Sequence, residues 1–266
     1  MSLPPTLRDR LAAADRPLVG LWNSTGGSVA AEILAVAGAD IILVDGEHGP
    51  IELREILGVL QAVAAYPTSP LVRVPVNDEV RIKQVLDLGA QNLLIPMVSS
   101  AAEAEAAVAA ARYPSTDRPG RRGIGAALAR SGRWGLEPGY VKSADAHVSV
   151  VAQIEDVSGV ENAEAIARTD GVDAVFIGPA DLAGQMGHAG DPSHLDVVAA
   201  VDATVRTVAA TGVPVGVNAF AEEDADRVLA AGASFVVVGA DVSLMARGAR
   251  AAVDRLRPAA GGIDNY

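Results

Sequence analysis

Short apolar runs alternate with helix-like segments along almost the whole chain. Eight of these runs are rich in Val, Ile and Leu and lack the apolar–polar alternation of a half-buried strand, which is typical of parallel strands covered on both faces. The runs cover residues 19–23, 41–47, 71–75, 92–98, 148–155, 174–179, 214–219 and 235–242. They predict eight parallel strands.

The segments between the runs are amphipathic or rich in alanine and predict the helices. They cover residues 28–37, 51–64, 78–88, 101–112, 157–168, 195–210 and 222–231. Three of them end in a glycine just before the next strand, at Gly38, Gly89 and Gly232, where glycine supplies a left-handed helix cap. The even repeat predicts an α/β fold, a closed (β/α)8 TIM barrel, as a single domain over residues 1–266. A doubly wound open sheet is the alternative, but it seldom repeats so evenly.

Two segments depart from the repeat. Residues 113–147 are rich in Pro, Gly and Arg, and we expect an elaborated loop after the fourth strand, at the mouth of the barrel. Residues 243–256 follow the eighth strand and predict an extra C-terminal helix.

Composition and charge narrow the class of protein. Hydrophobic residues make up 50% of the 266 residues but aromatic residues only 3%, so the core is built mainly from small aliphatic side chains. The formal net charge is −12, and an acidic chain without a basic run binds nucleic acid and anionic membranes poorly. No apolar run reaches the roughly 18 residues of a membrane span, and the first 20 residues do not resemble a signal peptide. The absence of cysteine excludes disulfides and thiolate chemistry and fits a cytoplasmic protein.

Polar residues at the strand ends are the candidates for chemistry, because the active site of a (β/α)8 barrel lies at the C-terminal ends of its strands. Gln153 and Glu155 are two residues apart on one strand and face the same side. Asp181 precedes a short predicted helix, so the backbone N–H groups near Ala180 and Asp181 could seat a carboxylate. Other polar residues at strand ends are Asp45, Glu47, His48, Arg73, Asn218 and Asp241.

Glu155 and Asp181 come from neighbouring strands and could give two oxygen ligands to one octahedral divalent cation. An acid/base pair and a structural ion pair with an arginine remain the alternatives. Arg73 interrupts an apolar strand, and a buried charge must be paired or functional; the structural alternative is a bridge to Asp45 or Glu47. His48 is either a catalytic base or an ordinary loop histidine.

The sequence lacks the residues that several classes of enzyme need for catalysis. The only lysines, Lys83 and Lys142, lie outside the predicted strands, which disfavours a Schiff-base aldolase. Nucleophile-elbow, Walker and dinucleotide-binding motifs are absent. The loops after the last two strands lack a glycine-rich phosphate cup, so we do not expect a phosphorylated substrate.

At these residues the chain resembles the hydroxy-keto-acid aldolases of the citrate lyase β-like family, the class II, metal-dependent pyruvate aldolases. The resemblance runs through most of the chain. Its most specific motifs are Asp45-Gly46-Glu47-His48, Ile82-Lys83-Gln84-Val85-Leu86-Asp87, Leu94-Ile95-Pro96-Met97-Val98, Gln153-Ile154-Glu155 and the run from Gly171 to Leu182.

The resemblance implies reversible cleavage of 4-hydroxy-2-keto acids to pyruvate and an aldehyde. Glu155 and Asp181 would bind a divalent metal ion, Mg²⁺, Mn²⁺ or Co²⁺. Gln153 and the backbone at Ala180 and Asp181 would hold the pyruvate end. His48 would be the base and Arg73 would stabilise the enolate oxygen.

The resemblance also implies that Asp87 raises the basicity of the histidine. Asp87 ends the helix after the third strand, which should run back to the far end of its own barrel, so the histidine would belong to a neighbouring subunit. Members of the family are often hexamers, trimers of paired barrels that exchange their last helix, and residues 243–256 would play that part here.

Two mouth segments, 23–27 and 215–220, depart from the family pattern and leave the aldehyde open. A 2-keto-3-deoxy sugar-acid aldolase is the alternative with the same core. A CoA-ester lyase of the citrate-lyase type is more distant, because no basic nucleotide site is evident. A non-catalytic barrel that binds a keto acid is the alternative from another class.

Overall fold

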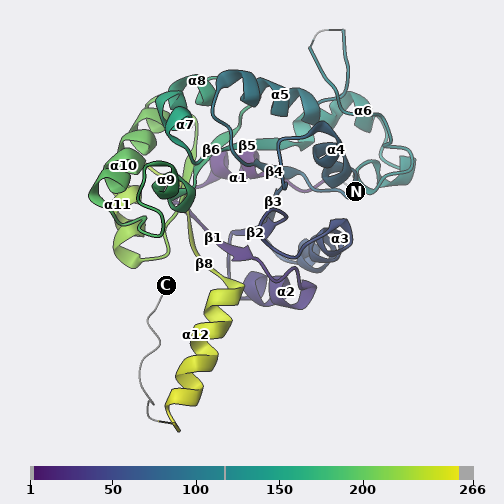
Figure 1. The fold of residues 1–266 in the computed structure, drawn as a ribbon. Coiled ribbons are helices and arrows are strands. Elements are labelled where there is room, and N and C mark those ends of the chain that lie inside the picture. The colour runs from purple at the N-terminus through teal and green to yellow at the C-terminus, as the bar shows by residue number, and fades with distance from the viewer. Residues whose placement is uncertain (1–2, 117, 258–266) are drawn as a thin grey trace.

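The computed structural model describes residues 3–116 and 118–257, and its eight strands close into a barrel (Figure 1). Each strand is parallel to both neighbours, and β1 pairs with β8 to complete the ring. The predicted (β/α)8 barrel is therefore confirmed. The strands are β1 (Leu18–Asn23), β2 (Ile41–Asp45), β3 (Ser69–Arg73), β4 (Asn92–Ile95), β5 (Ser149–Ile154), β6 (Ala174–Ile177), β7 (Val215–Asn218) and β8 (Phe235–Ala240).

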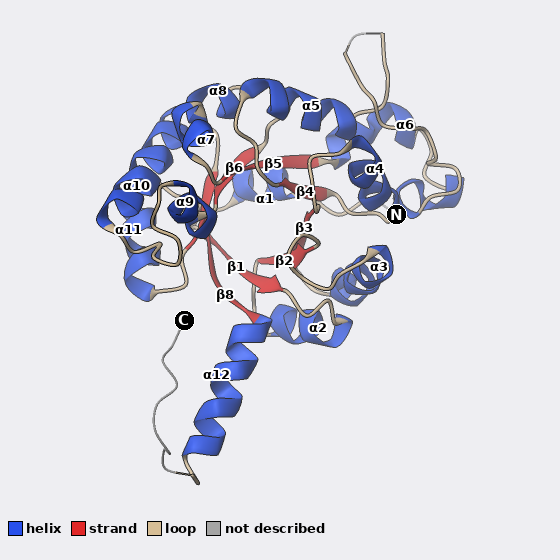
Figure 2. Ribbon diagram, in the orientation of Figure 1, coloured by secondary structure: helices blue, strands red, loops and turns tan. Residues whose placement is uncertain are grey.

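Helices surround the strands (Figure 2). They are α1 (Leu7–Ala13), α2 (Ser28–Val36), α3 (Leu53–Ala62), α4 (Glu79–Asp87), α5 (Ala101–Ala111), α6 (Tyr140–Ser143), α7 (Val157–Glu161), α8 (Ala163–Ala167), α9 (Pro179–Gln185), α10 (Leu195–Ala210), α11 (Glu222–Ala231) and α12 (Asp241–Asp254), with short 3₁₀ turns η1 (Val63–Ala65), η2 (Arg130–Gly135) and η3 (Ala144–His147).

Two apolar layers hold the barrel together. The outer layer packs the helices on the strands and consists mostly of Ala, Val, Ile and Leu. The inner layer fills the barrel and contains the buried aromatic rings of Trp22, Phe176 and Phe235. Phe176 and Phe235 stack with ring centroids 5.9 Å apart, so two of the few aromatic side chains fill the interior of the barrel.

The short helix α1 closes the N-terminal end of the barrel. The Thr6 side chain accepts from the backbone N–H of Asp9, and the Asp9 carboxylate accepts from the N–H of Thr6 at 2.9 Å. Leu7 is fully buried in the inner layer, and its N–H donates to Asn92 Oδ1 at 2.6 Å. The apolar pattern did not predict this helix, because its seven residues bury a single side chain and carry no periodicity.

The described residues of the long segment, 113–116 and 118–147, lie at the N-terminal end of the barrel, and the predicted place at the mouth was wrong. Gln91 Nε2, in the turn that leads into β4, donates to the carbonyls of Pro4 and His147 at 3.1 and 3.3 Å. Arg130 Nη1 donates to the carbonyl of Leu88 at 3.0 Å. The segment follows helix α5, which has already returned the chain to that end, and does not follow β4 directly.

Helix α12 extends away from the barrel (Figure 1), and the predicted extra C-terminal helix is confirmed. Its one buried residue is Asp241, at its first turn, whereas Leu244, Met245 and Val253 are each about half exposed or more. The predicted helix over 157–168 is divided into α7 and α8 at Asn162. Within residues 3–116 and 118–257, no helix is both long and apolar enough to cross a membrane.

Candidate active site

Arg73 is a buried cation at the mouth end of β3, 6% exposed. Its Nε and Nη2 atoms donate to Asp45 Oδ1 at 3.0 and 2.7 Å. Its guanidinium lies over the Trp22 ring, 4.4 Å from the centroid, and the indole N–H of Trp22 donates to Asn218 Oδ1 at 2.8 Å. Arg73 therefore forms the bridge that sequence analysis gave as the structural alternative, but this bridge also fixes the guanidinium in one orientation.

Arg73 keeps donors available for a ligand. Glu47 Oε2 lies 3.0 Å from Arg73 Nη1, yet it is buried and not aligned for a hydrogen bond with any group. The hydrogen bonds to Asp45 use one proton on Nε and one on Nη2, out of five guanidinium protons. A bound oxyanion could therefore receive hydrogen bonds from the remaining protons while Asp45 stays in place, and at Nη1 it would compete with the Glu47 carboxylate.

The turn after β2 depends on the Asp45 carboxylate and on a glycine. Asp45 Oδ1 also accepts from the backbone N–H groups of Glu47 and His48 at 3.2 and 3.1 Å. Gly46 approaches β3 so closely that a Cβ would stand 2.5 Å from the Arg73 carbonyl, so another residue would push the two strands apart. The Asp-Gly-Glu-His motif thus couples the turn to the position of Arg73.

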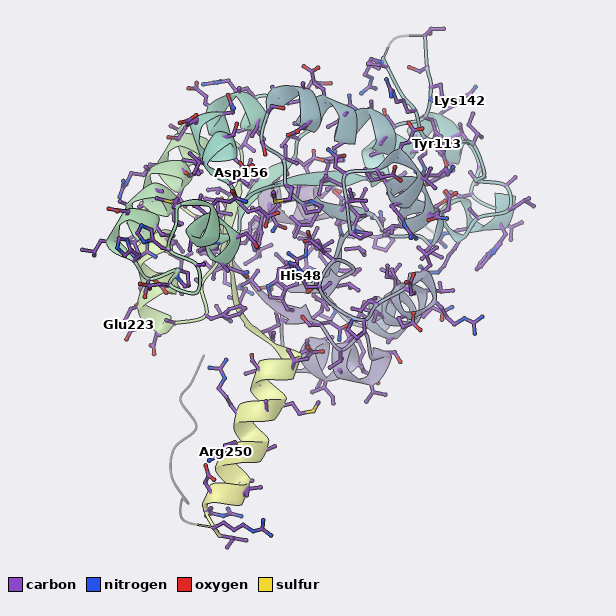
Figure 3. The ribbon with its side chains drawn as sticks, viewed as in Figure 1. His48, Tyr113, Lys142, Asp156, Glu223 and Arg250 are labelled. Carbon is purple, nitrogen blue, oxygen red and sulfur yellow. The ribbon has the colours of Figure 1, made fainter. Side chains whose placement is uncertain are left out.

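His48 lies near the middle of the barrel in the view of Figure 3. Its side chain is 63% exposed, and its Nε2 atom is 3.9 Å from Glu47 Oε2. An exposed imidazole beside a carboxylate can accept a proton from a ligand at the mouth.

Glu155 follows β5 and is 2% exposed. Its Oε1 atom accepts from the backbone N–H of Met97 at 2.8 Å, and its Oε2 atom accepts from Gln153 Nε2. Gln153 and Glu155 therefore lie on the same side, as their spacing predicts. The Gln153 Oε1 atom is buried without a partner, which leaves an unsatisfied acceptor beside the carboxylate.

Two backbone features outside the predicted site support Glu155. Met97 has a φ of +53°, a strained conformation for a residue with a side chain, and this conformation accompanies the N–H bond to Glu155. Gly178 leaves room for the carboxylate, because a Cβ there would stand 2.9 Å from Glu155 Oε2. Met97 and Gly178 belong to the Leu-Ile-Pro-Met-Val and Gly-Pro-Ala-Asp motifs, so the sequence pointed to both segments. The strained backbone at Met97 is visible only in the structure.

Asp181 lies in the first turn of α9, which begins at Pro179 directly after the Gly178 cap. Asp181 is exposed, and its charge reaches both Glu155 and Glu47, since it helps to raise the pKa of each. The structure therefore brings Glu155, Asp181, Gln153 and Arg73 to the mouth, with His48 beside them.

Burial raises the pKa of Glu155 to about 7, and the nearby carboxylates of Glu47 and Asp181 add to the rise, against the hydrogen bonds from Met97 and Gln153. Burial likewise raises the pKa of Glu47, although Arg73 and His48 oppose the rise. A cluster of carboxylates with raised pKa values has an excess of negative charge that a cation would neutralise.

This excess predicts a pH-dependent stability of the protein in EDTA. The Glu155 pKa rises from 4.5 to about 7 on folding, so the folded state holds a proton that the unfolded state has released. The stabilisation is fully present below the unfolded pKa and is lost as pH rises through the folded pKa. The free energy of unfolding should therefore fall by about 2 to 3 kcal/mol between pH 5 and 8. Urea unfolding across this range measures the loss.

Glu155→Gln is the matched variant for this measurement, because it keeps the shape of the side chain and removes the charge. It should flatten the slope and be more stable than the unsubstituted protein at pH 8. Glu47 and Asp173 also have raised pKa values, so part of the slope should remain. Equal slopes in both proteins would show that Glu155 does not titrate in this range.

Asp87 does not lie with these residues. It ends α4, at the opposite end of the barrel from the mouth, and its Oδ1 atom accepts from Arg122 Nη2 at 3.0 Å. Arg122 is 1% exposed and its guanidinium lies 4.4 Å from the centroid of the Tyr113 ring. Within one chain, Asp87 therefore pairs with Arg122 of the long segment. This position agrees with the expectation that α4 runs from the mouth back to the far end of the barrel.

Relatives at high identity bear the name of one enzyme. A protein of Salmonella dublin named 4-hydroxy-2-oxo-heptane-1,7-dioate aldolase is 48% identical over 242 residues, which are 91% of this chain and 91% of the relative. A protein of Salmonella heidelberg (strain SL476) has the same name, identity and coverage. These are the relatives to which the sequence motifs point.

Solved structures agree with the barrel in detail. An HpcH/HpaI aldolase/citrate lyase family protein from Burkholderia cenocepacia J2315 is 40% identical, with a TM-score of 0.89 over 94% of this chain and 98% of that one. An HpcH/HpaI aldolase from Desulfitobacterium hafniense DCB-2 is 28% identical, with a TM-score of 0.84 over 98% of this chain and 100% of that one.

The family model of HpcH/HpaI aldolase/citrate lyase matches residues 18–248. The matched range begins with β1 and ends inside α12, so it contains all eight strands and every predicted site residue. The prediction of an aldolase, a carbon–carbon lyase, is confirmed by this match and by the names of the relatives. The chain belongs to the HpcH/HpaI aldolase/citrate lyase family.

Proposed function

We propose that the protein is a class II pyruvate aldolase, which reversibly cleaves 4-hydroxy-2-keto acids to pyruvate and an aldehyde with the help of a divalent metal ion. The observation that carries this proposal is the arrangement of Glu155, Gln153 and Asp181 beside the fixed guanidinium of Arg73. The first substrate to test is the one in the name of the relatives, 4-hydroxy-2-oxo-heptane-1,7-dioate.

The donor set fits a hard divalent cation. Glu155 and Asp181 offer carboxylate oxygens, which suit Mg²⁺ and Mn²⁺ and are also accepted by Co²⁺. The raised pKa of Glu155 and the unpartnered Oε1 atom of Gln153 both indicate a site built around positive charge. When bound, the ion would polarise the 2-keto oxygen of the substrate as a Lewis acid.

The chain's own residues would hold the substrate and the charge that develops on it. The pyruvate end would be held by Gln153 and by the backbone at Ala180 and Asp181. When the bond between C3 and C4 breaks, its electron pair moves toward C2 and negative charge collects on the 2-oxygen. Arg73 would donate hydrogen bonds to that oxygen, and Asp45 keeps the guanidinium oriented before the reaction begins.

A base must take the proton of the 4-hydroxyl group as the aldehyde forms. We assign this role to His48, the exposed imidazole at the mouth. In the reverse direction the same imidazole would return the proton to the new alkoxide. Asp87 would raise the basicity of a histidine in a neighbouring subunit, which agrees with its place at the far end of its own barrel.

The role of Asp87 requires an oligomer, and we propose a hexamer of three paired barrels. The exposed apolar residues of α12 fit a helix that packs on a partner. We also propose a cytoplasmic enzyme, on the cysteine-free composition. Pyruvate and an aldehyde are the expected small-molecule partners.

Oxaloacetate tests the pyruvate-enolate chemistry without knowledge of the natural aldehyde. Loss of CO₂ leaves the electron pair of the broken bond on the same enolate, so the protein with Mg²⁺ should release pyruvate faster than a protein-free blank with the same Mg²⁺. EDTA should abolish the difference. The protein should be assayed with Mg²⁺, Mn²⁺ and Co²⁺ in turn. If it forms pyruvate no faster than the blank with any of these ions, the proposal is overturned in favour of a non-catalytic keto-acid binder.

A further inference from the structure

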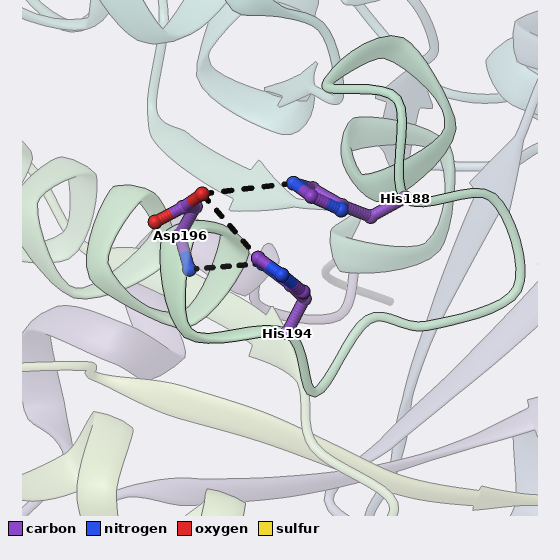
Figure 4. Close-up of side chains that lie close together, drawn as sticks. All are labelled: His188, His194 and Asp196. Carbon is purple, nitrogen blue, oxygen red and sulfur yellow. Dashed lines mark hydrogen bonds and ion pairs between the residues drawn. The ribbon is translucent and has the colours of Figure 1, made fainter.

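A second group of ligand-type side chains lies where the loop after α9 meets α10: His188 and His194 belong to the loop, and Asp196 to the first turn of α10. Figure 4 shows His188, His194 and Asp196 directed toward one another. Asp196 Oδ2 is 3.7 Å from His188 Nε2 and 3.7 Å from His194 Nδ1. Within residues 3–116 and 118–257, this is the one group of three or more His, Asp or Glu residues whose ligand atoms all lie within 4.8 Å of one another.

The spacing is close to that of a coordinated metal ion. Zn²⁺ binds imidazole nitrogen at about 2.0 to 2.1 Å in a tetrahedron, so neighbouring ligand atoms stand about 3.3 Å apart. The two distances of 3.7 Å exceed this value by a few tenths of an ångström. A small movement of the side chains would therefore complete three of four ligand positions.

Partial exposure gives the side chains room for that movement. The two imidazole rings are stacked, with centroids 3.5 Å apart and an angle of 14° between their planes, so they must splay for both nitrogens to face one ion. The His188 and His194 side chains are 26% and 37% exposed, and Asp196 is 71% exposed. His194 Nδ1 now accepts a hydrogen bond from the backbone N–H of Asp196 at 3.3 Å. It would lose this bond when it binds the ion.

The type of ligand distinguishes this cluster from the candidate active site. Glu155 and Asp181 offer only oxygen, which suits Mg²⁺ and Mn²⁺, whereas two imidazoles and one carboxylate suit Zn²⁺, Co²⁺, Ni²⁺ or Cu²⁺. We propose that His188, His194 and Asp196 form a second metal site, which binds a divalent transition-metal ion of the zinc type and leaves one position to water.

The place of the cluster suggests what the ion would do. The backbone N–H of His188 donates to the carbonyl of Ala183 in α9 at 2.7 Å, and the His194 side chain caps the first turn of α10. An ion held by His188 and His194 would tie these two helices together. Since α9 carries Asp181 in its first turn, the site would stabilise the helix that borders the active site.

Zn²⁺ titration by calorimetry tests the proposal, with Glu155→Gln protein used to remove the oxygen site. This protein should bind one Zn²⁺ per chain. Adding His188→Ala or His194→Ala should weaken Zn²⁺ binding more than about tenfold, because loss of a residue that only supports a metal ligand already costs about that much. Co²⁺ in place of Zn²⁺ should give the intense visible absorption of an imidazole-ligated tetrahedral ion.

Two matched variants control for general effects. Asp191→Asn removes a charge from the same loop, because the Asp191 carboxylate accepts from Ser193 and only its backbone bonds to His188 and His194. His147→Ala removes the imidazole that stacks on Tyr140. Both variants should bind Zn²⁺ as before. Zn²⁺ binding that survives both His188→Ala and His194→Ala, or that falls equally in the controls, would overturn the proposal. Circular dichroism of each variant identifies any loss of fold. The result is independent of the catalytic proposal, since it needs no turnover.

Discussion

Replacing Arg73 with lysine should cut kcat by about a thousandfold, which corresponds to the loss of one preorganised donor to a developing oxyanion. A lysine ammonium is a point charge and cannot use two nitrogens on Asp45 while directing a third toward the substrate. Lysine keeps the positive charge between Asp45 and Glu47, whereas alanine would leave the buried carboxylate of Asp45 without its cation, at a cost of about 3 to 5 kcal/mol. Lysine is therefore the more informative change.

Steady-state kinetics with a 4-hydroxy-2-keto acid and Mg²⁺ measures the effect. The loss should fall mainly on kcat, because Arg73 is expected to act on charge that develops after the substrate is bound. Arg16→Lys is the matched control: Arg16 also pairs with one carboxylate through two nitrogens, Asp40 at 2.8 and 2.9 Å, but belongs to no candidate site. A kcat for Arg73→Lys within a few-fold of the Arg16→Lys value would remove Arg73 from the mechanism.

The order of strands and helices could be predicted because each element carries its own signal. Helices α10 and α11 begin and end at the predicted residues. The predicted strand over 41–47 ends two residues earlier in the structure, because Gly46 and Glu47 form the turn after β2 and do not belong to the sheet. Apolar pattern alone does not separate the end of a strand from the turn after it.

The errors arose where tertiary contacts decide the structure. Helix α1 forms because Leu7 fills the open end of a barrel, a contact with Asn92 85 residues away. The segment 113–147 was placed at the wrong end because the prediction related it to β4 and not to α5, which precedes it. Asn162 ends α7 and precedes α8, and nothing in the apolar pattern marks that break.

Residue types and strand parity were sufficient to predict that Arg73, Gln153, Glu155 and Asp181 lie at the mouth of the barrel. They were insufficient for the residues that hold these groups. The turn at Met97 has a left-handed backbone that its sequence does not require, and the bond from Trp22 to Asn218 joins residues 196 positions apart. Such partners depend on barrel closure, which pairs β1 with β8 and so brings β1 within two strands of β7 only in the folded chain.

Replacing Glu155 with glutamine should abolish activation by Mg²⁺, with a loss of activity of more than about a thousandfold. The amide can keep the contact with Met97, since its oxygen accepts the same N–H that donates to Oε1 at 2.8 Å, so the turn stays in place. What it loses is the negative charge that a divalent ion needs as a ligand. Activity followed against Mg²⁺ concentration, with Mn²⁺ and Co²⁺ in parallel, measures the loss.

The reason for so large an effect is that Glu155 is the buried member of the pair, at 2% exposed, whereas Asp181 is exposed and can be replaced in part by water. Asp181→Asn should therefore weaken Mg²⁺ activation by less, and Glu164→Gln on the surface of α8, where Glu164 pairs with Arg168, should change nothing. The ordering matters as much as the size. If Asp181→Asn were more damaging than Glu155→Gln, the ion would be held mainly by the exposed carboxylate. The raised pKa of Glu155 would then reflect a buried acid that serves as a proton donor, the acid/base alternative for this pair of carboxylates.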